Sequence, residues 1–161
     1  MKTILATIFT VFAFQVAAGP LPDHNLTPGE ANPVLTTDVI CAKGFTTKTY
    51  RHVTSAMKRQ VYALYNMQPF KGTCAPKGCE VDHLISLSIG GANSIKNLWP
   101  QPFGGPWNAR MKDRLENRLH TLVCDGKMDL KEAQHEISTD WVSAYKKQFG
   151  THGSKPWSKT S

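Results

Sequence analysis

The four cysteines constrain the fold of this chain more than any other feature. If the chain is exported, as its first eighteen residues indicate below, an even number of cysteines predicts disulfide bonds, and four cysteines can pair in three ways. The residues between Cys74 and Cys79 are Ala-Pro-Lys-Gly, a turn-rich stretch that can close a small loop and leave Cys41 to reach Cys124 across the domain. We therefore expect the pairs Cys74–Cys79 and Cys41–Cys124. A structural zinc site is the alternative, but the C-x₂-C spacing and a matching second pair are missing.

The first eighteen residues have the organisation of a signal peptide. Lys2 precedes an apolar run over residues 4–14, and the small residues Ala17 and Ala18 follow it. This run is about half as long as a membrane-spanning helix needs to be, and no later stretch is apolar enough to span. We predict a signal peptide over residues 1–18, a secreted or periplasmic protein, and no membrane association after the signal is removed.

The mature chain is long enough for one domain with a real core. Removal of residues 1–18 from the 161-residue chain leaves 143 residues, too few for two independent domains. Residues 19–37 are rich in proline and aperiodic, which predicts an extended amino-terminal arm on the domain or a flexible tail. The folded domain is expected over residues 38–149, followed by a flexible tail over residues 150–161.

The chain is basic, with 19 Lys and Arg residues against 12 Asp and Glu residues. A cationic protein suits a polyanionic partner, because Lys and Arg side chains that neutralise phosphates release condensed counterions. Many secreted proteins are equally basic, however, so the charge alone does not select a nucleic acid as the partner.

Hydrophobic periodicity predicts three helices. Apolar residues recur at intervals of three and four over residues 54–65, 106–123 and 129–149. Asp129 is the expected N-cap of the last helix, with Glu132 placed three residues later as in a capping box.

Two strands are expected between the first two helices. Residues 80–88 predict a strand that runs into a turn at Gly90-Gly91, and residues 97–99 predict a second short strand. The order strand, turn, strand and helix indicates an α+β fold.

The residues of this segment resemble a known family. The runs Glu-Val-Asp-His-Leu-Ile (80–85), Gly-Gly (90–91) and Asn-Leu-Trp-Pro (97–100) are similar to the HNH endonuclease superfamily, the ββα-metal nucleases, and specifically to its exported bacterial branch. That branch also has similar short segments on both sides of the site. Before the site they match Thr-Pro-Gly (27–29), Asn-Pro (32–33) and Ile-Cys (40–41), and after it they match Lys-Asp (112–113), Glu116, Leu-His (119–120) and Val-Cys (123–124). The resemblance therefore covers about residues 27 to 149, nearly the whole mature domain.

This resemblance implies a disulfide-stabilised ββα-metal core with additional packing helices, and an HNH nuclease domain over residues 38–149. The implied function is that of a secreted, metal-dependent endonuclease with weak sequence specificity and with one divalent ion, Mg²⁺ or Mn²⁺, as cofactor. The expected partner is a nucleic acid, DNA before RNA, and an immunity or inhibitor protein is a further candidate. We expect a monomer.

Phosphodiester hydrolysis needs a base for the attacking water and a cation for the charge on the phosphate. In the family, the His of the Asp-His pair is the base and the Asp binds the metal, which implies these roles for His83 and Asp82. Asn97 corresponds to the Asn that holds the loop between the strands and orients the His. Adjacent strand residues point to opposite faces, so a bent or terminating strand is needed to bring Asp82 and His83 to one site.

The remaining site candidates lie on strand 80–88 and on the helix over residues 106–123. Asn108 is the expected second metal ligand, with Asp113, Glu116 and His120 as alternatives, and Asn108 is equally suited to cap the helix. Oxygen ligands favour Mg²⁺ or Mn²⁺ over structural zinc.

Glu80 and Lys112 complete the expected catalytic set, with Lys112 as a possible phosphate contact. Glu80 could instead pair with a basic side chain, and Lys112, Asp113 and Glu116 could form a solvated helix face.

Two other functions fit the same residues. A non-catalytic secreted protein with an HNH-like fold would bind nucleic acid without cutting it. A secreted toxin would use the same nuclease against a rival cell, and a neighbouring immunity protein would then be expected.

Overall fold

The computed structural model describes residues 20–67 and 78–150. The predicted signal peptide and residues 151–161 of the predicted tail lie outside the described residues. The helices and strands, in chain order, are α1 (Thr37–Ile40), η1 (Thr47–Thr49), α2 (Ser55–Leu64), β1 (Cys79–His83), η2 (Leu87–Ile89), η3 (Ile95–Asn97), β2 (Leu98–Pro102), α3 (Ala109–Cys124) and α4 (Leu130–Phe149), where η denotes a 3₁₀ helix. This mixture of helices with a small sheet confirms the predicted α+β class.

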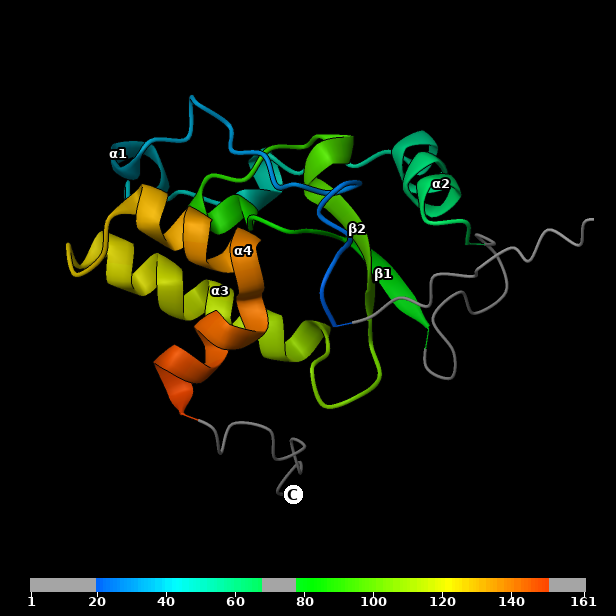
Figure 1. Ribbon diagram of the computed structural model, residues 1–161. Coiled ribbons are helices and arrows are strands. Elements are labelled where there is room, and N and C mark those ends of the chain that lie inside the picture. Colours follow the sequence, from blue (N-terminus) through cyan, green and yellow to red (C-terminus); the bar gives the residue numbers. More distant parts are fainter. Residues whose placement is uncertain (1–19, 68–77, 151–161) are drawn as a thin grey trace, which may run out of the picture.

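The sheet consists of β1 and β2, which pair antiparallel from His83 opposite Leu98 to Cys79 opposite Pro102. In Figure 1 this ribbon lies between α2 on one side and the α3–α4 pair on the other. The helix α3 follows β2 directly in the chain, so the described part contains the predicted order of strand, strand and helix.

Two apolar clusters hold these elements together. The larger cluster joins α3 and α4 with the loop after β1, and includes the fully buried residues Leu115, Leu119 and Trp141. The smaller cluster packs α2 against the sheet through Val61, Leu98 and other buried residues. Both clusters flank the end of β1 at His83, which is where the sequence places the site.

The amino-terminal arm lies on the domain, which is the first of the two predicted alternatives, an arm on the domain or a flexible tail. Thr27 is fully buried, and its hydroxyl lies 2.8 Å from the Tyr65 hydroxyl and donates to the Leu98 carbonyl oxygen at 2.9 Å. Further along the arm, Ala31 forms a β-bridge with Gly91. The arm therefore contacts both α2 and the loop that follows β1.

The three predicted helices are present with shifted ends. The helix α2 begins after Thr54, whose side chain accepts from the Met57 backbone N–H. The helix α3 begins after Asn108 instead of at the predicted Pro106, because the Asn108 side chain caps it. The helix α4 begins after Asp129, as predicted, but is kinked at Asp140, whose carboxylate accepts from the backbone N–H and hydroxyl of Ser143 and so caps the second half of the helix.

The predicted strand over residues 80–88 is too long. The strand β1 ends at His83. The Leu84 N–H still donates to the Asn97 carbonyl oxygen at 2.7 Å, but the backbone N–H and carbonyl oxygen of Ile85 bond to the Asn97 side chain instead of to a strand. Residues 87–89 form the helix η2 instead. Leu84, Ile85, Leu87 and Ile89 are all buried, so the apolar run that resembled a strand is core-facing loop and 3₁₀ helix.

A disulfide links Cys41 with Cys124 and confirms the predicted long-range pair. It ties the end of α1 to the end of α3, and such a bond is typical of proteins that fold in an oxidising compartment. Cys79 is disulfide-bonded as well, but Cys74 lies outside the described residues, so the pairing Cys74–Cys79 stays a prediction. None of the helices in the described part is long and apolar enough to cross a membrane.

Candidate functional site

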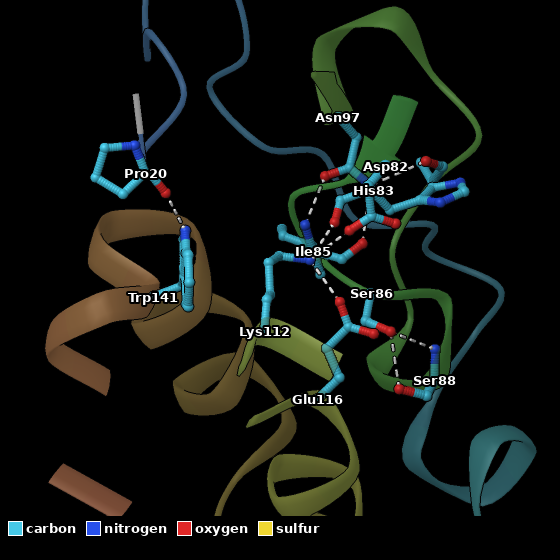
Figure 2. A network of polar contacts seen from close by, with 11 residues as sticks. Pro20, Asp82, His83, Ile85, Ser86, Ser88, Asn97, Lys112, Glu116 and Trp141 are labelled. Atoms are coloured by element: carbon cyan, nitrogen blue, oxygen red, sulfur yellow. Dashed lines mark hydrogen bonds and ion pairs between the residues drawn. The ribbon is translucent and has the colours of Figure 1, made fainter. Parts of the chain in front are cut away.

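The Asp82 and His83 side chains are positioned at the end of β1, where they leave the strand on different sides. The Asp82 carboxylate turns toward α3 and accepts a hydrogen bond from Lys112 Nζ at 3.0 Å. The His83 ring is 1% exposed and its Nε2 lies 3.0 Å from Asn93 Oδ1. Figure 2 shows Lys112 reaching from α3 toward Asp82, with Glu116 beside it. The strand ends directly after these two residues.

Lys112 is the buried centre of this arrangement. Its side chain is fully buried, and Nζ donates to Asp82 Oδ2 at 3.0 Å, to the His83 carbonyl oxygen at 2.6 Å and to Glu116 Oε1. Burial lowers the pKa of the ammonium, but the charges of Asp82 and Glu116 outweigh burial and hold that pKa above its ordinary value.

The ammonium group of Lys112 has three hydrogens, and all three are used by these acceptors. The expected phosphate contact at Lys112 therefore does not fit the geometry, and the expected solvated helix face does not hold for this residue. Instead, Lys112 ties the carboxylate of Asp82 and the backbone of His83 to α3.

His83 is held by a residue that the sequence did not single out. Asn93 lies in the loop after Gly90-Gly91, and its Oδ1 also accepts the His52 backbone N–H at 3.2 Å. Burial lowers the pKa of the His83 ring below its ordinary value, although the Asn93 hydrogen bond and the charge of Asp82 oppose the shift. The ring is therefore neutral at neutral pH. Its Nδ1 is buried and has no hydrogen-bond partner among the described residues.

Asn97 holds the loop between the strands, as expected. Its fully buried side chain accepts from the Ile85 N–H at 2.9 Å and donates to the carbonyl oxygens of Ile85 and Ala92, both at 3.0 Å. In the described part of the chain, none of its side-chain hydrogen bonds reaches His83, so the direct contact with the His belongs to Asn93.

The same loop requires glycine at both positions of the Gly-Gly motif. A Cβ atom on Gly91 would lie 1.8 Å from the Ile85 carbonyl oxygen, which no side chain can satisfy. Gly90 has a φ of 80°, in the left-handed region that favours glycine. The motif therefore allows the loop to close on itself beside His83.

Carboxylates gather around the end of β1. Burial, and then repulsion from Asp82, raises the pKa of Glu80 and of Asp113, while Lys112 and Arg51 oppose both shifts. Burial also raises the pKa of Glu116, to about 7. The carboxylates of this cluster interact with one another, and the side chains of Lys112, Arg51 and Arg110 are the cations that oppose their repulsion.

The donor chemistry of this cluster fits Mg²⁺ or Mn²⁺ better than a closed zinc site. Within residues 20–67 and 78–150, no three His, Cys, Asp or Glu side chains come close enough together to hold a metal ion. Mg²⁺ is commonly bound by only one or two protein carboxylates and completes its shell with water and substrate phosphates. Asp82, with one neighbouring oxygen ligand such as Asp113 or Glu80, matches that kind of site.

Two of the candidate ligands have other roles in the structure. Asn108 caps α3: its Oδ1 accepts from the Arg110 N–H at 3.1 Å and its Nδ2 donates to the Gly105 carbonyl oxygen at 2.8 Å. His120 lies near the disulfide, with Nε2 at 3.1 Å from the Ile40 carbonyl oxygen and 3.5 Å from Cys124 Sγ. The structure therefore brings together Glu80, Asp82, His83, Lys112, Asp113 and Glu116, and it places Asn108 and His120 in capping and packing contacts.

Arg51 is a second residue that the sequence did not single out. It is exposed, and it interacts electrostatically with Glu80, His83 and Asp113. Its place is fixed through Asn93, which bonds to the backbone of Tyr50 and of His52 on either side of it. A lone arginine in an aperiodic segment gives no sequence signal, since only the folded loop brings it to β1.

Comparison of the chain with models of protein families, with curated proteins and with solved structures found no match.

Proposed function

We propose that this protein is a secreted, metal-dependent endonuclease that hydrolyses phosphodiester bonds in nucleic acid, with His83 as the general base. The observation that carries the proposal is the state of His83: a neutral, buried imidazole with one ring nitrogen fixed by Asn93 and the other without a partner in the described residues. A base must keep a free lone pair at neutral pH, and this ring meets that condition.

The arrangement around His83 supports the same function. The strands β1 and β2 and the helix α3 follow one another in the order of a ββα-metal core, and a glycine-tight loop separates the strands. Asp82 precedes His83 and sits among carboxylates that favour a divalent cation. The proposal accordingly includes an HNH-like core and an Mg²⁺ or Mn²⁺ ion bound at Asp82.

In the proposed reaction, His83 takes a proton from a water molecule whose oxygen bonds to phosphorus. The P–O bond to the leaving 3′ oxygen breaks, and that oxygen takes a proton from solvent. The metal, when bound, stabilises the negative charge of the transition state. Lys112 holds Asp82 in place from the side of α3. Arg51 is the exposed cation best placed to contact a phosphate oxygen.

Substrate access requires a movement. Because Nδ1 of His83 is buried, the segments that cover the ring must open when nucleic acid binds. The exposed segment around Arg51 and His52 is joined to the ring through Asn93, so we expect this segment to stay in place while other parts of the cover open.

The test is digestion of plasmid DNA and of a folded RNA by the oxidised mature protein in Mg²⁺, in Mn²⁺ and in EDTA. We expect cutting that requires the metal, with DNA cut faster than RNA. Arg51→Gln should raise KM about tenfold or more if it contacts phosphate, whereas Arg59→Gln, an exposed arginine on α2, should not. Binding without cutting under every metal would leave the non-catalytic nucleic-acid-binding function in its place.

A further inference from the structure

The side-chain amide of Asn93 is bonded on three sides. Its Oδ1 accepts from the His52 backbone N–H at 3.2 Å and lies 3.0 Å from His83 Nε2, and its Nδ2 donates to the Tyr50 carbonyl oxygen. The two backbone groups belong to a segment about 40 positions earlier in the chain, as the separations of 41 and 43 residues record. One amide thus joins this segment to the end of β1.

The two backbone partners fix which way the amide points. If the amide were flipped, its NH₂ group would face the His52 N–H and its oxygen would face the Tyr50 carbonyl oxygen, so that both bonds would be replaced by repulsion. The atom next to His83 Nε2 is therefore the oxygen. An amide oxygen only accepts hydrogen bonds, so Nε2 must carry the proton.

We propose that Asn93 is the positioning residue of the site: it holds His83 in the tautomer with the proton on Nε2 and leaves Nδ1 as the atom that accepts a proton. The inference deepens the proposed function and rests on it for the catalytic role of Nδ1. Among residues 20–67 and 78–150 the buried Nδ1 has no hydrogen-bond partner, which fits this assignment, because a buried acceptor without a partner is costly and calls for a functional explanation.

The hydrogen bond to Asn93 is compatible with both protonation states of the ring. In the imidazolium both nitrogens donate, so the Nε2–H bond to Asn93 Oδ1 is kept while Nδ1 gains its proton. The ring therefore does not have to turn during turnover. A residue that bonded to only one of the two states would release the ring at each proton transfer.

The first experiment reads the tautomer directly. Long-range ¹H–¹⁵N correlation spectra distinguish the protonated ring nitrogen from the free one. They are recorded on the uniformly ¹⁵N-labelled mature protein in EDTA, at a pH at which the His83 ring is neutral. We expect the proton on Nε2 of His83, assigned by comparison with His83→Ala. A proton on Nδ1 would overturn the proposal, and this measurement needs no variant of Asn93 to fold.

The second experiment separates positioning from general support of the fold. Asn93→Leu, which keeps the size but removes all three bonds, should yield a mixture of His83 tautomers and lower kcat about 100-fold or more with KM nearly unchanged. Asn117→Leu, at an exposed position of α3, is the matched control and should change neither quantity. An unchanged tautomer and kcat in folded Asn93→Leu would refute the role of Asn93. Wild-type protein with the expected tautomer but no cutting activity would refute the proposed function and leave the tautomer assignment intact.

Discussion

Replacement of Lys112 by methionine tests the buried centre of the site. Methionine has nearly the length of lysine without its charge, so the change leaves the carboxylates of Asp82 and Glu116 without their shared cation and the His83 carbonyl oxygen without its donor. Removal of one partner from a buried ion pair costs about 3–5 kcal/mol. A loss of this size is a large fraction of the stability of a domain, which is about 5–15 kcal/mol.

Urea denaturation in EDTA measures this loss. With a slope of about 2 kcal/mol per molar urea, we expect the midpoint for Lys112→Met to fall by about 2 M. The double variant Lys112→Met/Glu116→Met should recover part of the loss, because it removes one of the two carboxylates left unpaired. Lys58→Met, at an exposed position of α2, is the control. A change of less than about 1 kcal/mol at Lys112 would refute the account of a cation that holds the site together.

Two further predictions concern stability. The pKa of Glu116 is about 7 in the folded protein against 4.5 ordinarily, so the folded state binds this proton more tightly and the free energy of unfolding falls as the pH rises from about 4.5 to about 7. Glu116→Gln should remove up to about 3 kcal/mol of that fall, which denaturation curves recorded across this pH range in EDTA measure. If the free energy of unfolding changes with pH to the same extent in both proteins, the raised pKa of Glu116 is contradicted. The Cys41–Cys124 bond closes a loop with a sequence separation of 83, so Cys41→Ser/Cys124→Ser should lose about 4 kcal/mol in thermal or urea unfolding, and a loss below about 1 kcal/mol would show that the bond contributes little.

Local sequence signals identified much of the fold correctly. Apolar periodicity and N-cap residues such as Asp129 located the three long helices, because a helix is specified largely within its own sequence. The strand β1 was overextended because the buried residues after His83, such as Leu87 and Ile89, have the composition of a strand but face a core shared with α3 and α4. The kink at Asp140 was missed because a capping residue inside a helical pattern does not interrupt the period.

The position of part of the candidate site could be predicted from the sequence where its residues lie on one short segment. Asp82, His83 and Asn97 are close in sequence, and Asn97 holds the loop as expected. Asn93 and Arg51 were missed because their roles depend on a contact between segments about 40 residues apart, and no local pattern marks such a contact.

Lys112 was expected either to contact a phosphate or to lie on a solvated helix face, and lysine is almost never fully buried unless it is paired. Only the packing of α3 on the end of β1 shows that its charge is buried between Asp82 and Glu116.

If His83 supplies the base of the proposed metal-dependent hydrolysis, its removal must slow the cleavage of supercoiled plasmid, and the initial rates of the wild-type protein and of His83→Ala measure this effect. Both proteins should carry the same disulfides and have the same circular dichroism spectrum, and both should be assayed in Mg²⁺ and in EDTA. We expect the wild type to cut in Mg²⁺ and not in EDTA, and we expect a rate about 100-fold to 10,000-fold lower for His83→Ala. Equal rates for the two proteins would rule out His83 as the base, and cutting that persists in EDTA would rule out a metal-dependent reaction.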